Sequence, residues 1–404
     1  MNSGRFLDRT TPPHIITLVV IAGVAALCMN VFLPSLAAMA LYFETDYAVM
    51  QFAVSGYLAA TACLQLVIGP LSDLFGRRPV MLVSIAIMIV ATLVCMLAPN
   101  ITVFMIGRVA QAAVVSGFVL ARAIVRDMVP MEQAASMIGY VTMGMSVVPM
   151  VGPTVGGLLN DISGWQSSFA LLCLLGIGIL VLAWFDLGET NHNKSASFSQ
   201  QFHAWPELLR SPLFWGYALT STFSSGMFFS FLGGAPFVGS VLYGLAPAML
   251  GLQFFGLQFF FMASGYMLGN FISGRYASEI GITRMMLSGN VIAIAGIVTT
   301  MVLISAGAES AYAFFVPLAL IGVGNGVTLP SANAGMVSVQ PHLAGSASGL
   351  GGAMTIGGGA ALSVLASSVL SKEDGTWPLL LVMLATGLVA LLTTYIVRLQ
   401  EKRE

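Results

Sequence analysis

The stretch Gly69-Pro70-Leu71-Ser72-Asp73-Leu74-Phe75-Gly76-Arg77-Arg78-Pro79 joins two long apolar runs of the chain. Gly76 supplies a tight turn, and Gly69 permits a close approach between helices. Asp73 and the arginine pair after Gly76 can bond neighbouring helix ends and so latch a helical bundle on one face. The alternative interpretation is an ordinary charged hairpin whose arginines only orient the chain.

The apolar character of these runs extends through the whole chain. Of the 404 residues, 57% are hydrophobic, and the mean hydropathy is +0.92. Only 8% are charged, whereas a soluble domain carries about 25%. So few charges cannot cover the surface of a water-soluble protein, and the composition therefore predicts a polytopic membrane protein. A net charge of -1 without a basic patch excludes a nucleic-acid partner.

Twelve segments are each apolar over about 20 residues, which is the length that a helix needs to cross ~30 Å of hydrocarbon. They are residues 14–36, 49–71, 80–98, 101–123, 134–159, 168–187, 212–235, 247–271, 284–305, 310–332, 345–369 and 377–398. The strands of a membrane β-barrel would be shorter and would alternate in polarity. An all-α fold of twelve transmembrane helices is therefore predicted.

The polar stretch from Glu189 to Ser211 separates six spans from six. We predict an N-terminal six-helix bundle over residues 1–189, a cytoplasmic linker over 190–211 and a C-terminal six-helix bundle over 212–404. This layout is typical of transporters built from two repeated bundles, which hold their substrate between the halves.

Basic residues predict the orientation of the chain in the membrane. With the N-terminus inside, the cytoplasmic side holds Arg5, Arg9, Arg77, Arg78, Arg122, Arg126, Lys194, Arg210, Arg275, Arg284, Arg398, Lys402 and Arg403. Lys372 alone falls in an outside loop, and Arg108 lies within a span. The positive-inside rule therefore places both termini in the cytoplasm. Cleavage of the first span as a signal peptide is disfavoured, because it would invert this charge pattern.

Three motifs, in chain order, resemble those of the major facilitator superfamily. The opening stretch resembles motif A, except that Leu74 stands where the pattern has an arginine. Arg108-Val109-Ala110-Gln111-Ala112 resembles motif B, and Gly152-Pro153-Thr154-Val155-Gly156-Gly157 resembles motif C, the antiporter signature. The resemblance covers nearly the whole length and implies the major facilitator fold.

Motif C has a physical interpretation of its own. Pro153 removes a backbone donor and is expected to bend the fifth span there. The flanking Gly152, Gly156 and Gly157 let this span press on its partner in the other bundle, and in the family this seal is linked to antiport. The alternative is a kinked packing helix with no coupling role.

Further segments resemble the Bcr/CflA drug-resistance efflux group within this superfamily. They are Phe32-Leu33-Pro34, Ala121 to Asp127, Trp165 to Phe169 and Pro330 to Ala334. This resemblance implies a proton-driven exporter of small amphipathic antimicrobials in the bacterial cytoplasmic (inner) membrane, working as a monomer. The alternative is a metabolite carrier, a uniporter or symporter that shares the fold and the motifs.

Arg108 is the first candidate for a role in substrate binding or coupling. An arginine inside a span costs at least a few kcal/mol, so Arg108 must face protein or water. Gln111 lies on the adjoining side of the same helix. The alternative is that Arg108 bonds neighbouring carbonyl groups and only holds helices together.

Polar residues in two other spans are further candidates for substrate contact. Tyr57, Thr61 and Gln65 recur every four residues and share one helix face, although inter-helix hydrogen bonding explains such a row equally well. Asn325 lies in a glycine-rich part of the tenth span, where a helix could break and expose its carbonyl groups.

Proton antiport needs a titratable group, and members of the family commonly keep a carboxylate just before the Phe-Leu-Pro element. Here Asn30 occupies the matching position, and none of the 16 acids lies deep in a span. Asp127, beside Arg126, is the first candidate for a relocated carboxylate, with a structural ion pair as the alternative. Asn30 is expected to contribute hydrogen bonds to substrate or to Arg108.

The sequence offers little support for an enzyme or a metalloprotein. The spans contain no Ser/His/Asp arrangement and no paired carboxylates, so we predict that the chain is not an enzyme. Neither the four cysteines nor the four histidines show metal-ligand spacing, and no metal or cofactor is expected. The predicted partners are a small-molecule substrate, protons and the lipid bilayer.

Overall fold

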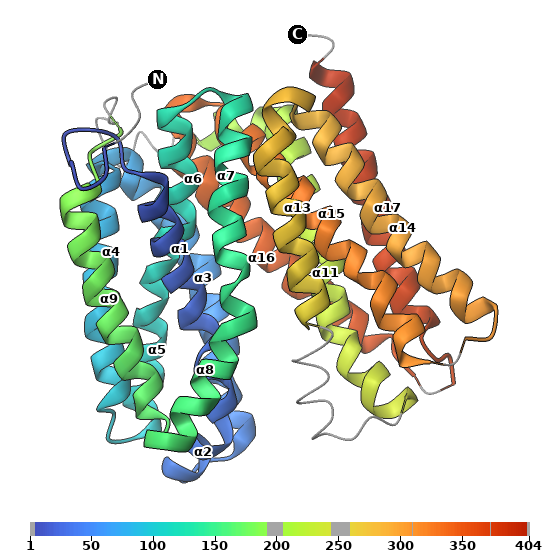
Figure 1. Ribbon diagram of the computed structural model, residues 1–404, viewed down its shortest axis with the longest axis horizontal. Helices are drawn as coiled ribbons and strands as arrows, with labels where there is room; N and C mark the ends of the chain where they lie inside the picture. The colour runs from blue at the N-terminus through green and yellow to red at the C-terminus, as the bar shows by residue number, and fades with distance from the viewer. Residues whose placement is uncertain (1–4, 192–204, 244–258, 309, 372, 402–404) are drawn as a thin grey trace. The chain divides into compact units, whose positions relative to one another are not determined.

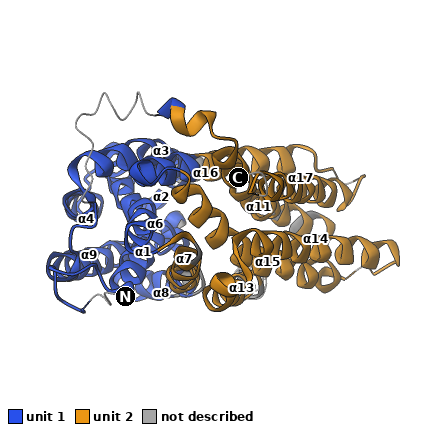
Figure 2. Cartoon of the chain, turned by 90° about the horizontal axis from the view of Figure 1, so that it is seen from above, with its two compact units in different colours: residues 1–129, 147–206, 340–353 blue, residues 130–146, 207–339, 354–404 orange. Residues whose placement is uncertain are grey.

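The computed structural model describes residues 5–191, 205–243, 259–308, 310–371 and 373–401, apart from a few side chains within the helices. By contacts the chain forms two compact units (Figure 2). Unit 1 comprises Met1–Val129, Val147–Pro206 and Gln340–Ala353; unit 2 comprises Pro130–Ser146, Glu207–Val339 and Met354–Glu404. The boundary predicted at residues 190–211, of which 192–204 lie outside the described residues, stays a prediction.

Unit 1 is built from helices only, among the residues that are described. They are α1 (Ile15–Asn30), η1 (Leu33–Ser35), α2 (Leu36–Tyr42), α3 (Tyr47–Phe75), α4 (Arg77–Met96), α5 (Ile101–Gln111), η2 (Ala112–Val115), α6 (Ser116–Met128), α8 (Val148–Ser163), α9 (Gln166–Asp186) and η5 (Pro341–Leu343) (Figure 1). The first residues of α16 (Ala344–Ser368) also belong to this unit.

Unit 2 is equally helical in its described part. It contains α7 (Met131–Ser146), α11 (Pro212–Phe237), η3 (Val238–Leu242), α13 (Phe259–Ile280), α14 (Ile282–Ser305), α15 (Ala311–Ser338), α17 (Trp377–Glu401) and the rest of α16. Helix α15 packs against α13, α14, α11 and α7 and forms the centre of the unit.

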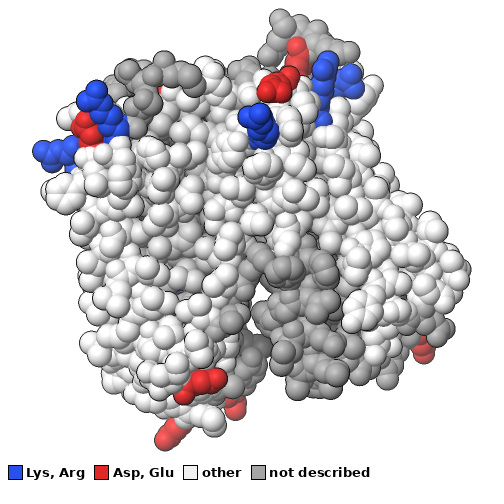
Figure 3. Space-filling view, in the orientation of Figure 1, with Lys and Arg blue, Asp and Glu red and all other residues white. Residues whose placement is uncertain are grey.

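The predicted all-α membrane fold is confirmed, and each of the twelve predicted spans overlaps a helix. Within the described ranges, nine helical segments are long and apolar enough to cross a membrane. Span 134–159 is divided between α7 and α8, and the first part of span 247–271, residues 247–258, lies outside the described residues. On the visible face of each unit, Lys and Arg lie at one end of the helices, and a broad band without charge follows (Figure 3).

Proline and glycine act differently from the sequence-based expectations in two spans. The fifth span breaks at Val147, where α8 begins with a proline in its first turn, and not at Pro153, which lies inside α8. Helix α15 runs unbroken through the glycine-rich stretch that was expected to break. The glycines there accommodate neighbouring helices, because a methyl group at Gly324 would lie 2.7 Å from Ala293 Cβ.

A single residue, Gly76, connects α3 and α4. Gly76 has φ +105° and donates its N–H to the carbonyl of Ser72 at 3.1 Å. A side chain is strained at such a backbone conformation, which is why glycine stands here. The turn brings Arg77, the first residue of α4, back beside the last turn of α3.

The N-terminal segment is held by a buried carboxylate at the end of α9. Asp186 Oδ1 accepts the N–H of Leu7 at 2.7 Å, and Asp186 Oδ2 accepts the N–H of His14 at 3.0 Å. Within the segment, Thr10 donates hydrogen bonds to Asp8, which lower the pKa of that exposed carboxyl. The segment therefore lies against α9 before α1 begins.

Candidate functional site

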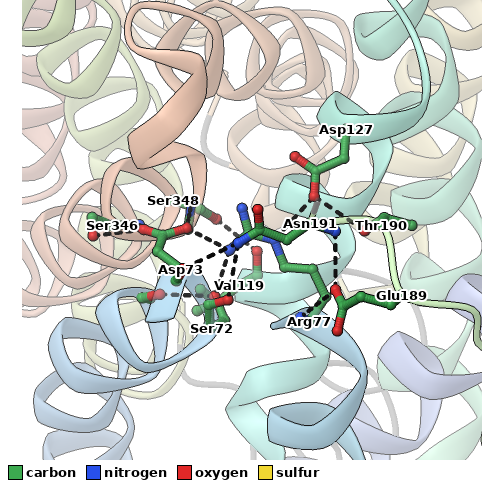
Figure 4. Close-up of polar contacts among 12 residues, drawn as sticks. Ser72, Asp73, Arg77, Val119, Asp127, Glu189, Thr190, Asn191, Ser346 and Ser348 are labelled. Atoms are coloured by element: carbon green, nitrogen blue, oxygen red, sulfur yellow. Dashed lines mark hydrogen bonds and ion pairs between the residues drawn. The ribbon is translucent and has the colours of Figure 1, made fainter. Parts of the chain in front are cut away.

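Asp73 is the centre of a buried polar cluster in unit 1 (Figure 4). Its Oδ1 accepts the N–H of Gly345 at 3.0 Å, and its Oδ2 accepts both the N–H and the hydroxyl of Ser346 at 2.8 Å. Gly345 and Ser346 are in the first turn of α16, where backbone N–H groups have no helical acceptor. The carboxylate therefore binds the positive end of the α16 dipole.

Arg77 lies buried in the same cluster and joins two carboxylates. Its Nη1 donates to Asp73 Oδ1 at 2.5 Å and to Ser72 Oγ at 2.7 Å, and its Nε donates to Asp127 Oδ2 at 3.0 Å. The ends of α3 and α6 are thus tied together through the start of α4. A buried pair of this kind is held by several charge-assisted hydrogen bonds at once.

The segment after α9 completes the cluster, and sequence analysis missed its part. Glu189 Oε1 accepts the backbone N–H of Arg77 at 2.9 Å, and the Thr190 hydroxyl donates to Asp127 Oδ2 at 3.1 Å. Asn191 Nδ2 donates to the carbonyl of Asp73 at 3.1 Å. Glu189 stands just after the sixth predicted span, and an acid there could have indicated a polar contact. Its partner Arg77 is 112 residues away in sequence, so the sequence did not show what it binds.

Two helical glycines, Gly69 in α3 and Gly345 in α16, make this close packing possible. A methyl group at Gly69 would overlap the carbonyl oxygen of Gly345, and one at Gly345 would lie 2.6 Å from Asp73 Oδ1. Helices α3 and α16 therefore touch backbone to backbone. Arg78 lies apart from the cluster: its Nη2 donates to the carbonyl of Trp184 at 3.0 Å, and its guanidinium lies 5.3 Å from that indole ring.

Arg108 forms a second polar centre in unit 1, and its side chain is 1% exposed. Its Nε and Nη1 donate to the carbonyls of Ala53 and Cys28, each at 3.3 Å. Nη1 also donates to Gln111 Oε1. Two aromatic rings lie against the guanidinium, Phe32 at 4.2 Å and Tyr57 at 4.3 Å from ring centroid to guanidinium carbon.

Of the other predicted residues in unit 1, Gln111 and Tyr57 lie beside Arg108, whereas Asn30 does not bond to it. Gln111 Nε2 donates to the Thr92 hydroxyl at 2.7 Å. Asn30 Nδ2 donates to the carbonyl of Ala26 at 2.8 Å, and its Cβ is on the side of α1 that faces Gly152. Arg108 bonds instead to the backbone carbonyl of Cys28. The other predicted role of Asn30, a hydrogen bond to substrate, stays a prediction.

Gln65 lies on the same helix as Tyr57, but it contacts α16 and not Arg108. Its carbonyl and its Oε1 would be overlapped by methyl groups at Gly349 and Gly352, respectively. Gln65 therefore packs against α16, two helical turns from Tyr57. Its Nε2 has no hydrogen-bond partner among the described residues.

The motif C glycines pack within unit 1. A methyl group at Gly152 would lie 3.1 Å from Leu27 Cδ1, and one at Gly156 would overlap the carbonyl oxygen of Val31. A methyl at Gly157 would lie 3.7 Å from Pro34 Cβ. These neighbours lie in α1, in η1 and at Val31 between them. A contact of the motif C glycines with the other bundle stays a prediction, and the side chain of Pro153 lies outside the described residues.

Asn325 lies in α15 of unit 2 and is 4% exposed. Its Oδ1 has no hydrogen-bond partner in the described part of the chain. Asn325 in unit 2 thus resembles Gln65 and Arg108 in unit 1, each of which also has a buried polar atom without a partner among the described residues. Sequence analysis had selected each of these three residues.

The chain matches a known family and several curated relatives. The model of the Major Facilitator Superfamily matches residues 18–364. The chain is 31% identical over 240 residues to the uncharacterized MFS-type transporter YdgK of Bacillus subtilis (strain 168), which covers 58% of this chain and 60% of that protein. It is 28% identical over 386 residues to the chloramphenicol resistance protein of Pseudomonas aeruginosa, 94% of this chain and 89% of that protein.

Similarity over nearly the full length recurs with other proteins. The multidrug resistance protein D of Escherichia coli (strain K12) is 28% identical over 381 residues, 94% of each chain. Among solved structures, the E. coli fucose:proton symporter FucP has a TM-score of 0.75 at 14% identity and covers 95% of this chain and 97% of its own. At that identity the structural likeness shows the fold alone.

Proposed function

Because the chain belongs to the Major Facilitator Superfamily, we propose that this membrane transporter exports small amphipathic, drug-like compounds across the bacterial cytoplasmic membrane. Similarity over 94% of the chain to a chloramphenicol resistance protein and to a multidrug resistance protein carries the proposal. Both names describe resistance to drugs, which a membrane carrier gives by lowering the drug concentration inside the cell.

The surroundings of Arg108 support an amphipathic ligand. The rings of Phe32 and Tyr57 offer apolar surface, and the guanidinium between α1, α3 and α5 offers hydrogen-bond donors. A mainly apolar site with a few placed polar groups is typical of small-molecule binding.

The growth of an efflux-deficient bacterium that expresses the chain tests this function. The panel comprises phenicols, bicyclomycin, quinolones and cationic dyes, with the Arg108→Ala variant as the matched control. We expect the native chain to raise the inhibitory concentration of at least one compound and the variant to abolish this effect. Unchanged inhibition across the whole panel would contradict drug export.

For the driving force we propose proton antiport through Asp127. Asp127 bonds to Arg77 and Thr190, and an arginine keeps a neighbouring carboxylate ionised. A conformational change that separates Asp127 from Arg77 would let the carboxylate take up a proton. The alternative role for Asp127 is a structural ion pair.

Proteoliposomes with an imposed proton gradient distinguish these roles. If a gradient drives substrate accumulation by the native protein but not by Asp127→Asn, the carboxylate takes part in coupling. If both proteins respond alike, Asp127 is structural. Asn30→Asp is expected to change the pH dependence of transport, because it restores a titratable group at the position where the family commonly has one.

A second candidate function is favoured by one observation. Asn30 occupies the usual carboxylate position and bonds only to its own helix among the described residues, which suits a carrier that does not move protons. Such a protein would transport a metabolite by uniport. A native protein that shows no gradient response, together with no resistance, would support this candidate.

A further inference from the structure

Arg108 differs from the other buried charged side chains described in unit 1, because it has neither a counter-ion nor a complete set of hydrogen bonds among the described residues. Those others are Asp73, Arg77 and Asp186. Arg77 is paired with two carboxylates, and Asp186 accepts two backbone N–H groups. Every hydrogen bond that Arg108 donates within the described residues ends on a neutral oxygen.

The ionisable neighbours of Arg108 do not supply the missing charge. They are Tyr57, Cys28 and Cys95, and phenols and thiols of this kind are neutral near pH 7. The nearest polar side chain, Gln111, is an amide. Unit 1 therefore keeps an unpaired positive charge in its interior, which is energetically unfavourable.

One nitrogen of the guanidinium also lacks an acceptor. Arg108 Nη2 is buried and has no hydrogen-bond partner among the described residues. A guanidinium presents its N–H groups as a planar fork that fits a carboxylate. An anionic oxygen would both accept a hydrogen bond from the free nitrogen and compensate the charge.

We propose that the ligand bound by unit 1 carries a negative charge, a carboxylate or a phenolate on an apolar body, with Arg108 as its counter-ion. The proposal rests on the transport function proposed above and names the charge class of the substrate. A cationic ligand would meet an uncompensated like charge in a low-dielectric interior. Because Phe32 and Tyr57 enclose Arg108, the ligand reaches it in a conformation in which a ring has moved aside.

Binding of three probes with one apolar body tests the charge preference in the purified full chain. The probes are 2-naphthoate, 2-naphthamide and 2-naphthylmethylammonium, at a pH where the first is ionised and the last protonated. We expect naphthoate to bind about 10-fold to 100-fold tighter than the amide, the range for a hydrogen bond to a charged group, and the ammonium to bind most weakly. Equal affinities, or tightest binding of the ammonium, would overturn the proposal.

Gln111→Glu then tests whether Arg108 is the counter-ion. This nearly isosteric change puts a carboxylate on the atom that already accepts from Arg108 Nη1. We expect the preference for naphthoate to disappear. The matched control is Asn100→Asp, which adds the same charge to the exposed N-cap of α5, where either side chain accepts the N–H of Val103. It should keep the preference; if Gln111→Glu also keeps it, Arg108 is not the counter-ion.

The outcomes separate this inference from the proposed export. Resistance to neutral or cationic drugs without a preference for naphthoate would contradict the anionic substrate but would still support drug export. A preference for naphthoate without any resistance would contradict drug export and would support a carrier that binds anions.

Discussion

The Oδ2 atom of Asp73 accepts two hydrogen bonds from Ser346, one from its backbone and one from its hydroxyl, across 273 positions of the sequence. The other oxygen of the same carboxylate accepts from Gly345 and from Arg77. One buried side chain thus joins the end of α3 to the start of α16 and to the first residue of α4.

Replacing this carboxylate by an amide should weaken the cluster. Asp73→Asn keeps the volume but leaves Arg77 paired with Asp127 alone, and breaking a buried ion pair costs about 3–5 kcal/mol. We expect a lower unfolding temperature in detergent and reduced transport. Asp46→Asn is the control, since Asp46 is an exposed residue at the other end of α3 without a side-chain capping bond. Equal unfolding temperatures for the two variants would contradict the role of Asp73.

Glycine contacts give a steric prediction within unit 1. Gly156→Ala places a methyl group on the carbonyl oxygen of Val31, whereas Gly56→Ala meets nothing within 4 Å. Overpacking of a tight interface costs about 1–3 kcal/mol. We therefore expect Gly156→Ala to lower the unfolding temperature and Gly56→Ala to leave it unchanged or slightly raised. A tolerated Gly156→Ala would show that α1 and α8 separate easily.

Arg108 offers a prediction on transport. Arg108→Ala should abolish transport while the protein still inserts and accumulates, and Arg108→Lys should restore only part of it, because lysine lacks the guanidinium fork. Efflux of the compound identified in the growth panel, normalised to protein in the membrane, provides the measurement. Near-normal efflux by the alanine variant would assign Arg108 to helix packing.

Topology is open to a direct test. Reporter fusions at Pro99-Asn100 and within residues 372–375 should read outside, and a fusion near Lys194 should read inside. The reason is the concentration of lysine and arginine at the predicted cytoplasmic ends. A cytoplasmic signal from either of the first two fusions would overturn the predicted order of spans.

Much of the helical layout could be predicted from the sequence, because about 20 apolar residues in a bilayer have few alternatives to a helix. The turn at Gly76 was likewise evident, since a positive φ favours glycine. In the fifth span the helix breaks at Val147, before the proline at position 149, whereas Pro153, where a bend was predicted, lies inside α8. Two prolines lie in that span, and the sequence alone does not show which of them begins a new helix.

The partners of the polar residues were harder to predict. Tyr57, Gln111 and Arg108 were selected for their polarity within apolar spans, and they lie together in the structure. The contribution of Ser346 and Glu189 to the Asp73 cluster was missed, because periodicity places a residue on a helix face without showing which distant segment meets that face. Asn30 was predicted to bond to substrate or to Arg108; in the structure its amide donates to the carbonyl of Ala26, and Arg108 Nη1 donates to the backbone carbonyl of Cys28.

The bond between Asp73 and Gly345 also has a consequence for biosynthesis. A ribosome adds about 5–20 residues per second, so Gly345 emerges roughly 15–55 seconds after Asp73 has been made. During that interval the Asp73 carboxylate lacks the donors of Gly345 and Ser346 that bind it in the finished protein. The packing of α16 against α3 in unit 1 is therefore completed only after most of the chain has been synthesised.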